Sequence, residues 1–449
     1  MSNGDLPDLD AALDADTRRG ESGGADRQRP AAGSSGTDPN VDVSTDLTRA
    51  PTGPLADHVL DDALTYARER EYTGWDYGDG MSSRALQALP VDSRLLNLAV
   101  QEVVKRTPVN VRPLFLVEQR RNYMGASLFA MTNLTLDRLL DEGSGLPVDE
   151  TVDYRREAHR LLTWLVDNRA SGHSGFGLGH QHPIQDLQGL ADANEPGAVC
   201  TSIAAKALLR GSDIDEGFAD VAETAADFVV EDLEYRPTEE GARITYSNNH
   251  EGEYYTINAG ALAGRLFVDL YDHVDTRAYR RRARQILDHI ATLQEDAGGW
   301  MYRDPPTASH LSMDTHHNGF IIEAFQRYAA ATGDDRYADV CSAALSFFET
   351  LFDDDGAPHF DEDTRYPRDI HACAQGILVF TYAGDVERAG RILEWTVENL
   401  YAGGGRFYFR KGRLVTHRVT LMRWCQAWMC FAMSEYLRAV CGERPIASV

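Results

Sequence analysis

A repeated helical hairpin is the feature that most constrains the fold of this chain. Each copy has an amphipathic segment, a loop with glycine and an aromatic residue, and a second segment that begins polar and becomes small and apolar. The second segments begin at Ser202, Asn258, His317, Cys373 and Cys425, at intervals of 56, 59, 56 and 52 residues. Such a period is typical of repeat architectures, in which one hairpin cannot bury its faces alone and must stack on its neighbours.

A further copy, "MGASLFAM" from Met124, lies 78 residues before Ser202, and an enlarged loop around residues 170–196 accounts for the longer interval. The helical periodicity predicts an all-α structure. Six hairpins of this spacing close naturally into an (α/α)6 toroid, with small-residue helices in an inner ring and charged amphipathic helices outside. An open solenoid is the competing arrangement. The aromatic-rich loops before the second segments favour closure around one central cavity.

Residues 1–54 differ in composition from the rest of the chain. The stretch "ESGGADRQRPAAGSSGTDPN" is rich in Gly, Ser, Asp and Pro, and no aromatic residue occurs before Tyr66. A segment with so little apolar surface cannot offset the entropy that it loses on ordering. We therefore predict a disordered acidic tail over residues 1–54 and a single toroid domain over residues 55–449.

The protein is expected to have a strongly acidic surface. Its 449 residues include 70 Asp and Glu against 44 Lys and Arg, a formal charge of −26, and the only lysines are Lys105, Lys206 and Lys411. An acidic, lysine-poor chain is typical of a protein that works in molar salt, where charge repulsion is screened. This composition predicts a halophilic, archaeal source. The same charge disfavours nucleic acid as a partner, because nucleic acid needs a basic face.

Three features predict a cytoplasmic protein. No run of about 18 apolar residues exists, so no membrane-spanning helix is expected. The N-terminus lacks the apolar core of a secretory signal. The six cysteines are scattered through apolar helical patterns without a C-x-x-C pair, as expected of buried thiols in a reducing compartment.

The toroid arrangement predicts where functional residues converge. In such a ring every inner helix begins at the same end, so residues just before the helix starts share one mouth. Acids and histidines at this mouth are the predicted catalytic residues: Asp76, Glu253, Asp314, His316, His317 and Asp369. Aromatic, histidine and arginine residues there are predicted to bind substrate: Trp75, Tyr77, His250, Tyr254, Tyr255, His371, Arg423 and Trp424.

These residue types indicate a glycan site rather than a lipid site. Paired carboxylates in a partly dry cavity can differ in pKa and serve as acid and base, and in a hydrolase their separation would set retention or inversion. Aromatic rings form platforms for sugar faces, and arginine favours anionic groups such as a uronate carboxylate. In an isomerase, a tyrosine or histidine would move a proton beside a carboxylate that Arg423 holds.

Several of these residues also have a structural interpretation. Asp314 and Asp369 each precede a helical segment and suit helix capping as well as chemistry. His316 and His317 are adjacent, so on a helix they diverge by about 100°, and one of them is expected to face the cavity. No H-E-x-x-H pattern, cysteine pair, P-loop or dinucleotide fingerprint is present, so we predict no metal and no cofactor.

Four segments, "GWDYGDGMSS", "LQEDAGGWMY", "DTHHNGFIIEAF" and "GGRFYFRKGRLVTHRVTLMRWCQAWMCFAMSEYL", resemble the six-hairpin glycosidase-like superfamily. More narrowly, they are similar to toroid proteins of surface-polysaccharide synthesis and archaeal S-layer N-glycosylation, over roughly residues 56–441. The resemblance implies an isomerase or hydrolase that takes part in adding a hexuronic acid to an N-linked glycan. Its substrate would be a glycan or a lipid-linked oligosaccharide. The resemblance implies no fixed catalytic set, so the predicted site residues are chosen only by their position at the mouth of the toroid.

Two other functions stay open at this point. "LQEDAGGW" also resembles the Q-x-x-x-G-x-W element of squalene-type cyclases, but the chain lacks their D-x-D-D element. "DIHAC" completes only part of the zinc pattern of protein prenyltransferases. A terpenoid cyclase or prenyltransferase-like enzyme is one alternative, and a non-catalytic glycan-binding toroid is the other. The fold alone does not choose among these functions.

Overall fold

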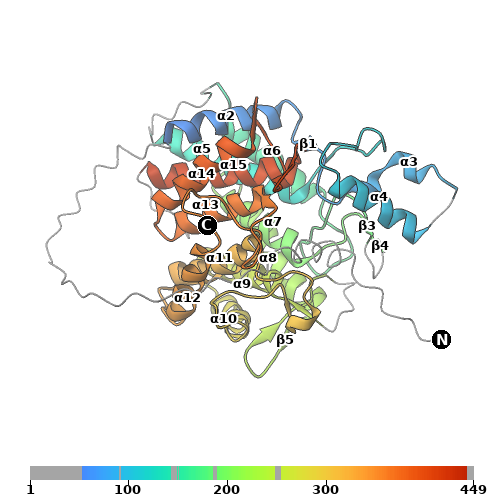
Figure 1. Cartoon of the computed structure of the whole chain (residues 1–449). Coiled ribbons are helices and arrows are strands. Elements are labelled where there is room, and N and C mark those ends of the chain that lie inside the picture. Colours follow the sequence, from blue (N-terminus) through green and yellow to red (C-terminus); the bar gives the residue numbers. More distant parts are fainter. Residues whose placement is uncertain are drawn as a thin grey trace, which may run out of the picture.

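The computed structural model describes residues 53–90, 93–142, 149, 151–185, 190–247 and 254–441, which form a ring of helical hairpins (Figure 1). The inner ring consists of α5 (Tyr123–Asp141), α7 (Ala198–Arg210), α9 (Ile257–Val274), α11 (Thr315–Thr332), α13 (Ile370–Tyr382) and α15 (Trp428–Val440). Each inner helix contacts the next, and α15 contacts α5, so the ring is closed. The predicted (α/α)6 toroid is therefore confirmed, and the open solenoid is excluded. Residues 1–52 of the predicted tail lie outside the described residues.

A second set of helices packs around this ring. The outer helices are α2 (Gly53–Arg68), α6 (Tyr154–Asp167), α8 (Gly217–Asp227), α10 (Arg277–Ala291), α12 (Ala338–Glu349) and α14 (Val386–Leu400). The helices α6, α8, α10, α12 and α14 contact α5, α7, α9, α11 and α13 in turn, and α2 contacts α15. Shorter helices extend or precede these elements: the π-helix η4 (Phe228–Asp232), η5 (Pro306–Ala308) and the π-helix η6 (Met422–Ala427).

Small residues allow the inner helices to crowd together. Every residue of α9 from Ile257 to Leu270 is buried, whereas α10 outside it buries one face. A Cβ atom at Gly319 of α11 would lie 1.9 Å from Cγ of Gln375 on α13. Only glycine allows this approach of the two helices. The composition of the second segment of each repeat therefore follows from its place in the ring.

Short antiparallel strands lie in the loops between the helices. The pairs are β1 (Thr73–Gly74) with β2 (Arg120–Arg121), β3 (Ile184–Gln185) with β4 (Leu190–Ala191), β5 (Arg236–Pro237) with β6 (Ala242–Arg243), β7 (Tyr255–Thr256) with β8 (Arg303–Asp304), and β10 (Tyr401–Gly403) with β11 (Arg406–Phe407). A three-stranded sheet has the order β13 (Thr416–His417), β12 (Arg410–Lys411), β9 (Arg368–Asp369). The strands β7 and β9 directly precede α9 and α13, and each pairs with the loop before the next inner helix. The loops of the predicted mouth are thus joined to one another.

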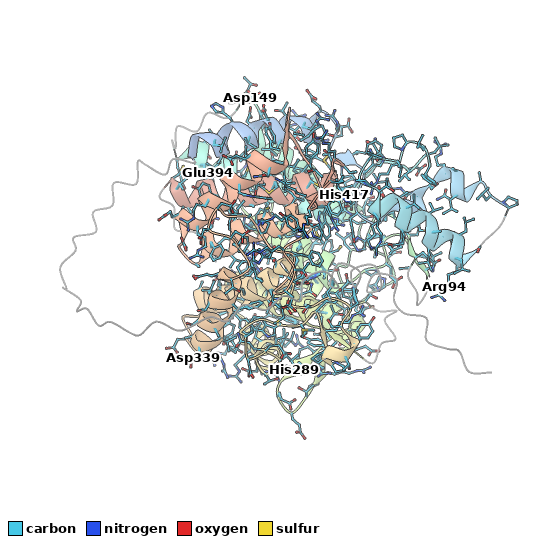
Figure 2. The ribbon with its side chains drawn as sticks, viewed as in Figure 1. Arg94, Asp149, His289, Asp339, Glu394 and His417 are labelled. Atoms are coloured by element: carbon cyan, nitrogen blue, oxygen red, sulfur yellow. The ribbon has the colours of Figure 1, made fainter. Side chains whose placement is uncertain are left out.

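A lobe, residues 75–90 and 93–119, extends from one side of the ring between β1 and β2 (Figure 1). It contains the 3-10 helix η3 (Asp79–Ser82), α3 (Arg84–Gln87) and α4 (Arg94–Arg106), which the repeat did not predict. Figure 2 shows Arg94 at the outer end of the lobe, with Asp339 and Glu394 across the ring on α12 and α14. Both η3 and α4 contact β3 in the enlarged loop before α7. The lobe therefore covers one side of the mouth.

Candidate active site

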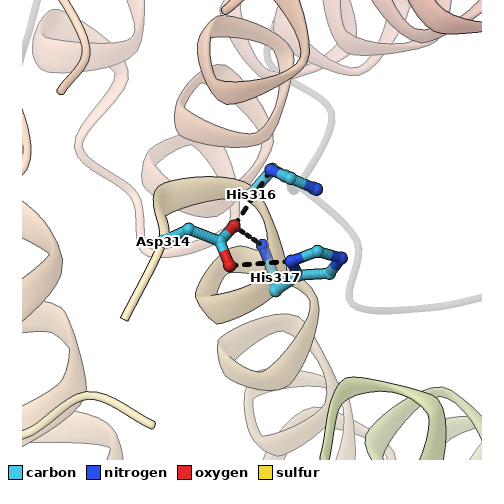
Figure 3. Close-up of side chains that lie close together, drawn as sticks. All are labelled: Asp314, His316 and His317. Carbon is cyan, nitrogen blue, oxygen red and sulfur yellow. Dashed lines mark hydrogen bonds and ion pairs between the residues drawn. The ribbon is translucent and has the colours of Figure 1, made fainter. Parts of the chain in front are cut away.

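Asp314 caps the N-terminus of α11 and also holds two histidines (Figure 3). Its Oδ1 accepts a hydrogen bond from the backbone N–H of His317 at 3.0 Å, which confirms the capping interpretation. The Nδ1 atoms of His316 and His317 lie 3.0 and 2.7 Å from its Oδ1 and Oδ2. With Nδ1 engaged by the carboxylate, a neutral ring carries its proton on Nδ1 and keeps its lone pair on Nε2.

The rings of His316 and His317 do not diverge as expected for neighbours on a helix. Their centroids are 3.9 Å apart, and both rings bind the same carboxylate. The two histidines are the second and third residues of α11, and the capping side chain lies across the start of the helix within reach of both. The 100° rule holds for the Cα–Cβ directions, and the shared acceptor draws the rings together.

The electrostatics of this group keep the aspartate ionised. Burial raises the pKa of Asp314, but the attraction of His317 and His316 outweighs it, and the pKa lies far below its usual value. Burial lowers the pKa of His317 to about 4, although Asp314 opposes the shift. At neutral pH His317 is therefore a neutral base that an anionic carboxylate orients.

His371 joins this group to the aromatic part of the mouth. Its ring stacks on His316 with centroids 4.9 Å apart and meets Trp424 edge-on at 4.6 Å. Its side chain is buried, and neither ring nitrogen has a hydrogen-bond partner among the described residues. Burial, followed by repulsion from His316, holds the pKa of His371 well below its usual value. A buried imidazole of this kind is available to a ligand or a substrate atom.

Asp76 forms the centre of a second group. Its Oδ2 accepts hydrogen bonds from Arg423 Nε at 2.8 Å and Asn122 Nδ2 at 2.7 Å, and its Oδ1 accepts one from the backbone N–H of Tyr77 at 2.7 Å. Burial raises the pKa of Asp76, but Arg423 and His182 outweigh it, and the pKa lies below its usual value. Asp76 is thus a fixed anion that positions a buried guanidinium.

Consecutive residues of the π-helix η6 connect the two groups. Arg423 binds Asp76, and the indole N–H of Trp424 donates to Oδ1 of Asp369 at 2.8 Å. Asp369 also caps α13 by accepting a hydrogen bond from the backbone N–H of His371 at 2.9 Å. Tyr77 stacks on Trp424 with centroids 4.7 Å apart. The structure therefore brings together nine of the predicted residues: Asp76, Tyr77, Asp314, His316, His317, Asp369, His371, Arg423 and Trp424.

The other predicted residues have different positions. Trp75 lies beside this cluster and donates its indole N–H to the carbonyl of Val117 in the lobe at 3.3 Å. The ring of Tyr254 lies 3.8 Å from the Arg303 guanidinium carbon, at the edge of the mouth. Tyr255 points away from the cluster, against Gly260 of α9 and His289 of α10. Glu253 and His250 lie outside the described residues.

Four charged or ionisable residues of the site are not among the predicted catalytic or substrate-binding residues. Arg112 of the lobe donates to both oxygens of Asp79 at 2.8 and 3.0 Å, and Asp79 accepts the backbone N–H of Asp76 at 3.0 Å. Burial raises the pKa of Asp79 to about 6 despite Arg112. Burial also lowers the pKa of His180 to about 3 and of His182 to about 4. The one sequence signal for this pair is "GHQHP", two histidines in the enlarged loop before an inner helix.

Asp314, His316 and His317 are also the group of described residues that could hold a metal ion. One ligand atom from each lies within 4.8 Å of the others. Three such ligands match an open, catalytic type of zinc site in number, but both Nδ1 atoms already face the carboxylate, so a metal would need the Nε2 atoms or a rearranged carboxylate. The absence of a metal stays a prediction.

Comparisons with known proteins place the fold among sugar-processing toroids. No family model and no curated protein sequence matches the chain. A cellobiose 2-epimerase from Spirochaeta thermophila is similar with a TM-score of 0.56 at 13% identity, over 88% of this chain and 98% of that chain. The unsaturated glucuronyl hydrolase of Bacillus sp. GL1 has a TM-score of 0.54 at 14% identity, over 86% and 95%. The GH76 alpha-mannanase of Bacteroides thetaiotaomicron has a TM-score of 0.53 at 14% identity, over 72% and 86%.

These structures are six-hairpin glycosidase-like toroids, as the sequence resemblance implies, and at such low identity the likeness shows the fold alone. Their names include epimerases as well as hydrolases. Among the described residues, no helix is long and apolar enough to cross a membrane. The six cysteines all lie among the described residues, and no disulfide joins them.

Proposed function

We propose that this protein is a sugar epimerase or isomerase that acts by proton transfer on a hexuronate-containing glycan. The observation that carries the proposal is the Asp314 carboxylate bound to Nδ1 of both His316 and His317. An ionised acceptor fixes the tautomer and orientation of a histidine base and leaves Nε2 to take a proton from carbon. His371 supplies another buried imidazole beside them.

The proton balance of this reaction needs no cofactor. A histidine Nε2 removes the proton from a carbon next to a carbonyl or carboxyl group, and the C–H electron pair moves into an enediolate. For an epimer, a second histidine that starts protonated delivers its proton to the other face of the same carbon, and the first histidine later releases the abstracted proton to solvent. For an isomer, the carbon lies next to a carbonyl, the abstracted proton is returned to the former carbonyl carbon, and the hydroxyl proton moves from one enediolate oxygen to the other. A cation or hydrogen-bond donor near the developing oxyanion lowers the barrier.

The substrate class is inferred from the rest of the cluster. Tyr77 and Trp424 form a stacked aromatic pair that suits the face of a sugar ring. Arg303 and Arg410 provide partly exposed guanidinium groups around the mouth, which suit an anionic sugar. The cellobiose 2-epimerase and the unsaturated glucuronyl hydrolase share this fold. We place the reaction in cell-surface glycan synthesis, such as S-layer N-glycosylation, in a halophilic cytoplasm, with a glycan or lipid-linked oligosaccharide as substrate.

A glycoside hydrolase is less well supported by the described carboxylates. Asp76, Asp314 and Asp369 are each engaged by donors from two or more residues. The pKa values of Asp76 and Asp314 lie below the usual value, so neither is held as a proton donor. Burial raises the pKa of Asp79 to about 6, but both of its oxygens accept hydrogen bonds from Arg112, so it is not free to protonate a glycosidic oxygen. Hydrolysis needs one carboxyl group that keeps its proton near neutral pH.

The deciding experiment is turnover of uronate-containing oligosaccharides in concentrated salt made up in heavy water, followed by mass spectrometry. A mass gain of one unit without cleavage is expected for proton exchange at carbon. A shortened product would replace the proposal with a hydrolase, and an unsaturated end would indicate a lyase. Saturable binding of several uronates without any mass change would indicate a non-catalytic binding protein.

Asparagine variants test the histidines within the same assay. His317→Asn places an amide N–H near the position of Nδ1, so the contact with Asp314 can persist while the Nε2 base is removed. We expect exchange to fall by about 100-fold or more in this variant. The matched control is His173→Asn, because His173 Nδ1 lies 3.0 Å from Asp232 Oδ1 in a similar pair and its ring packs on Phe228. Equal activity in the two variants would show that His317 is not the base.

A further inference from the structure

A small cavity lies on the axis of the inner ring, below the candidate active site. Its lining comes from five of the six inner helices: Leu128, Met131, Ser202, Ile203, Lys206, Leu262, Arg265, Phe320, Glu323, Trp428 and Phe431. Two of these residues, Phe320 and Trp428, also contact the ring of His371, so His371 lies between the mouth and this cavity. The volume is about 20 Å³. About 10–15 Å³ suffices for one water molecule, so the cavity fits a single occupant of atomic size.

Several side chains that line this cavity carry hydrogen-bond donors. Arg265 Nε, Trp428 Nε1 and Ser202 Oγ are buried and have no hydrogen-bond partner among the described residues, and Arg265 Nε lies 3.7 Å from Asp269 Oδ2. A guanidinium and an indole nitrogen only donate, and a hydroxyl can donate. Lys206 adds an ammonium group, which also only donates. Four donors around one small space indicate an occupant that accepts hydrogen bonds.

Lys206 is a buried cation whose neighbouring carboxylates are engaged elsewhere. Its side chain is 6% exposed, and its Nζ lies 4.8 Å from the ring centroid of Phe431. Glu323 pairs with Arg265, and Glu435 accepts two hydrogen bonds from Arg210 at 2.8 and 3.0 Å. Burial, followed by repulsion from Arg265 and Arg210, holds the pKa of Lys206 well below its usual value, so the ammonium form needs a counter-ion to persist.

When Lys206 is protonated, the positive charges along the axis of the ring outnumber the negative charges by one. The ion-paired groups around the cavity and below it are the cations Arg210, Arg265, Arg327 and Arg438 with the carboxylates Asp269, Asp272, Glu323 and Glu435. These four cations and four carboxylates balance. A protonated Lys206 adds one positive charge that this network leaves uncompensated, and one monovalent anion restores the balance.

We propose that this cavity is a binding site for one halide ion, held by Lys206 Nζ, Arg265 Nε, Trp428 Nε1 and Ser202 Oγ. A halide accepts hydrogen bonds from all four groups without having to donate any. A carboxylate or phosphate is polyatomic and exceeds the space for one atom. In the molar salt that the composition predicts, a site with millimolar affinity is filled throughout. The site does not depend on the reaction at the mouth.

Bromide provides the first test, because its anomalous scattering identifies it in a crystal. Crystals of the full chain grown in chloride and soaked in sodium bromide are expected to show an anomalous peak among the four donor atoms. A water molecule there, or density without an anomalous signal, would overturn the proposal. This measurement uses the unaltered protein, so it decides the matter even where a variant fails to fold.

Thermal unfolding provides the second test. At constant sodium concentration and ionic strength, replacing methanesulfonate, which is too large for the cavity, by chloride is expected to raise the unfolding midpoint with saturation. Lys206→Met, which keeps the chain length and removes the charge, should abolish the dependence, and Trp428→Phe should shift it to higher chloride. The matched control is Lys411→Met, because Lys411 of β12 donates to Asn399 of α14, and neither residue lines the cavity. Equal chloride dependence in the two lysine variants would overturn the proposal.

Discussion

Asp314 and Asp76 occupy the same mouth and are almost equally buried, at 1% and 5% exposure, but their partners differ in kind. Asp314 binds two imidazoles, groups that can take up and release a proton. Asp76 binds Arg423, which keeps its charge at any pH that the protein survives. An aspartate therefore supports proton transfer on one side of the mouth, at Asp314, and holds a fixed positive charge on the other side, at Asp76. The four predictions below test this difference.

Asp314→Asn is expected to have the largest effect, a loss of about 10²- to 10⁴-fold in turnover. Asparagine is as good a helix cap as aspartate, but its amide nitrogen cannot accept a hydrogen bond from the second imidazole. The measurements are exchange in heavy water and the unfolding midpoint. Asp153→Asn is the matched control, because Asp153 caps α6 and accepts the backbone N–H of Arg156 at 2.9 Å. Full turnover in Asp314→Asn would show that Asp314 acts only as a helix cap.

Asp76→Asn is expected to act mainly on stability. The substitution leaves the Arg423 guanidinium buried without its anion, which typically costs about 3–5 kcal/mol of unfolding free energy. Denaturant unfolding in concentrated salt measures the change. Glu387→Gln is the control, because the exposed Glu387–Arg391 pair on α14 should contribute less than about 1 kcal/mol. Similar losses of unfolding free energy in the two variants would mean that the buried Asp76–Arg423 pair contributes no more to stability than an exposed pair.

The Asp314 and Asp76 sides of the mouth should also differ in how they change the unfolding free energy as the pH falls. The pKa of His317 is lowered to about 4 in the folded protein, against about 6.5 in an unfolded chain. A lowered histidine pKa gives stability that is present above about pH 6.5 and is lost as the pH falls from about 6.5 to about 4, by up to about 1.4 kcal/mol per pH unit for each proton. His317→Asn should therefore show a shallower fall in unfolding free energy over this range. Tyr255→Phe should keep the full slope, since a tyrosine does not titrate there.

The smallest effect is expected from Tyr255→Phe. The Tyr255 hydroxyl is buried, lacks a hydrogen-bond partner among the described residues and lies against Gly260, away from both aspartates. Removing an unsatisfied buried hydroxyl is neutral or stabilising, by up to about 1 kcal/mol. Turnover should stay within about twofold of the unaltered protein, as for other substitutions outside the site. A large loss of turnover would restore Tyr255 to the substrate-binding residues.

The ring itself was predictable because each repeat has the sequence pattern of a helical hairpin. The second segments were expected to begin at Asn258 and His317, and the helices begin at Ile257 and Thr315. Once the ring closes, residues before the inner helices must meet at one end. That geometry is why Asp76 and Arg423, 347 positions apart, could both be assigned to the mouth from the sequence.

The errors lie where position depends on contacts between irregular segments. Asp79 and Arg112 belong to a lobe without periodicity, and His182 lies in a loop whose strand β3 pairs with β4 and packs on that lobe. No local pattern reports such contacts. Tyr255 was misplaced for a different reason. It begins β7 and packs against His289 of α10, whereas Tyr254 precedes the strand and packs on Arg303.

The closure of the ring has a consequence for how the chain is made. The helix α15 packs on α5, α2 and α13, and Glu435 accepts a hydrogen bond from Thr135, 300 residues earlier. A growing chain that has emerged through α13 exposes the apolar flanks of α5 and α13, since the helix that covers both is the last of the ring to be synthesised. Contacts of such long range fold slowly, and exposed apolar flanks aggregate. We expect the nascent protein to need protection by a chaperone until residue 440 has left the ribosome.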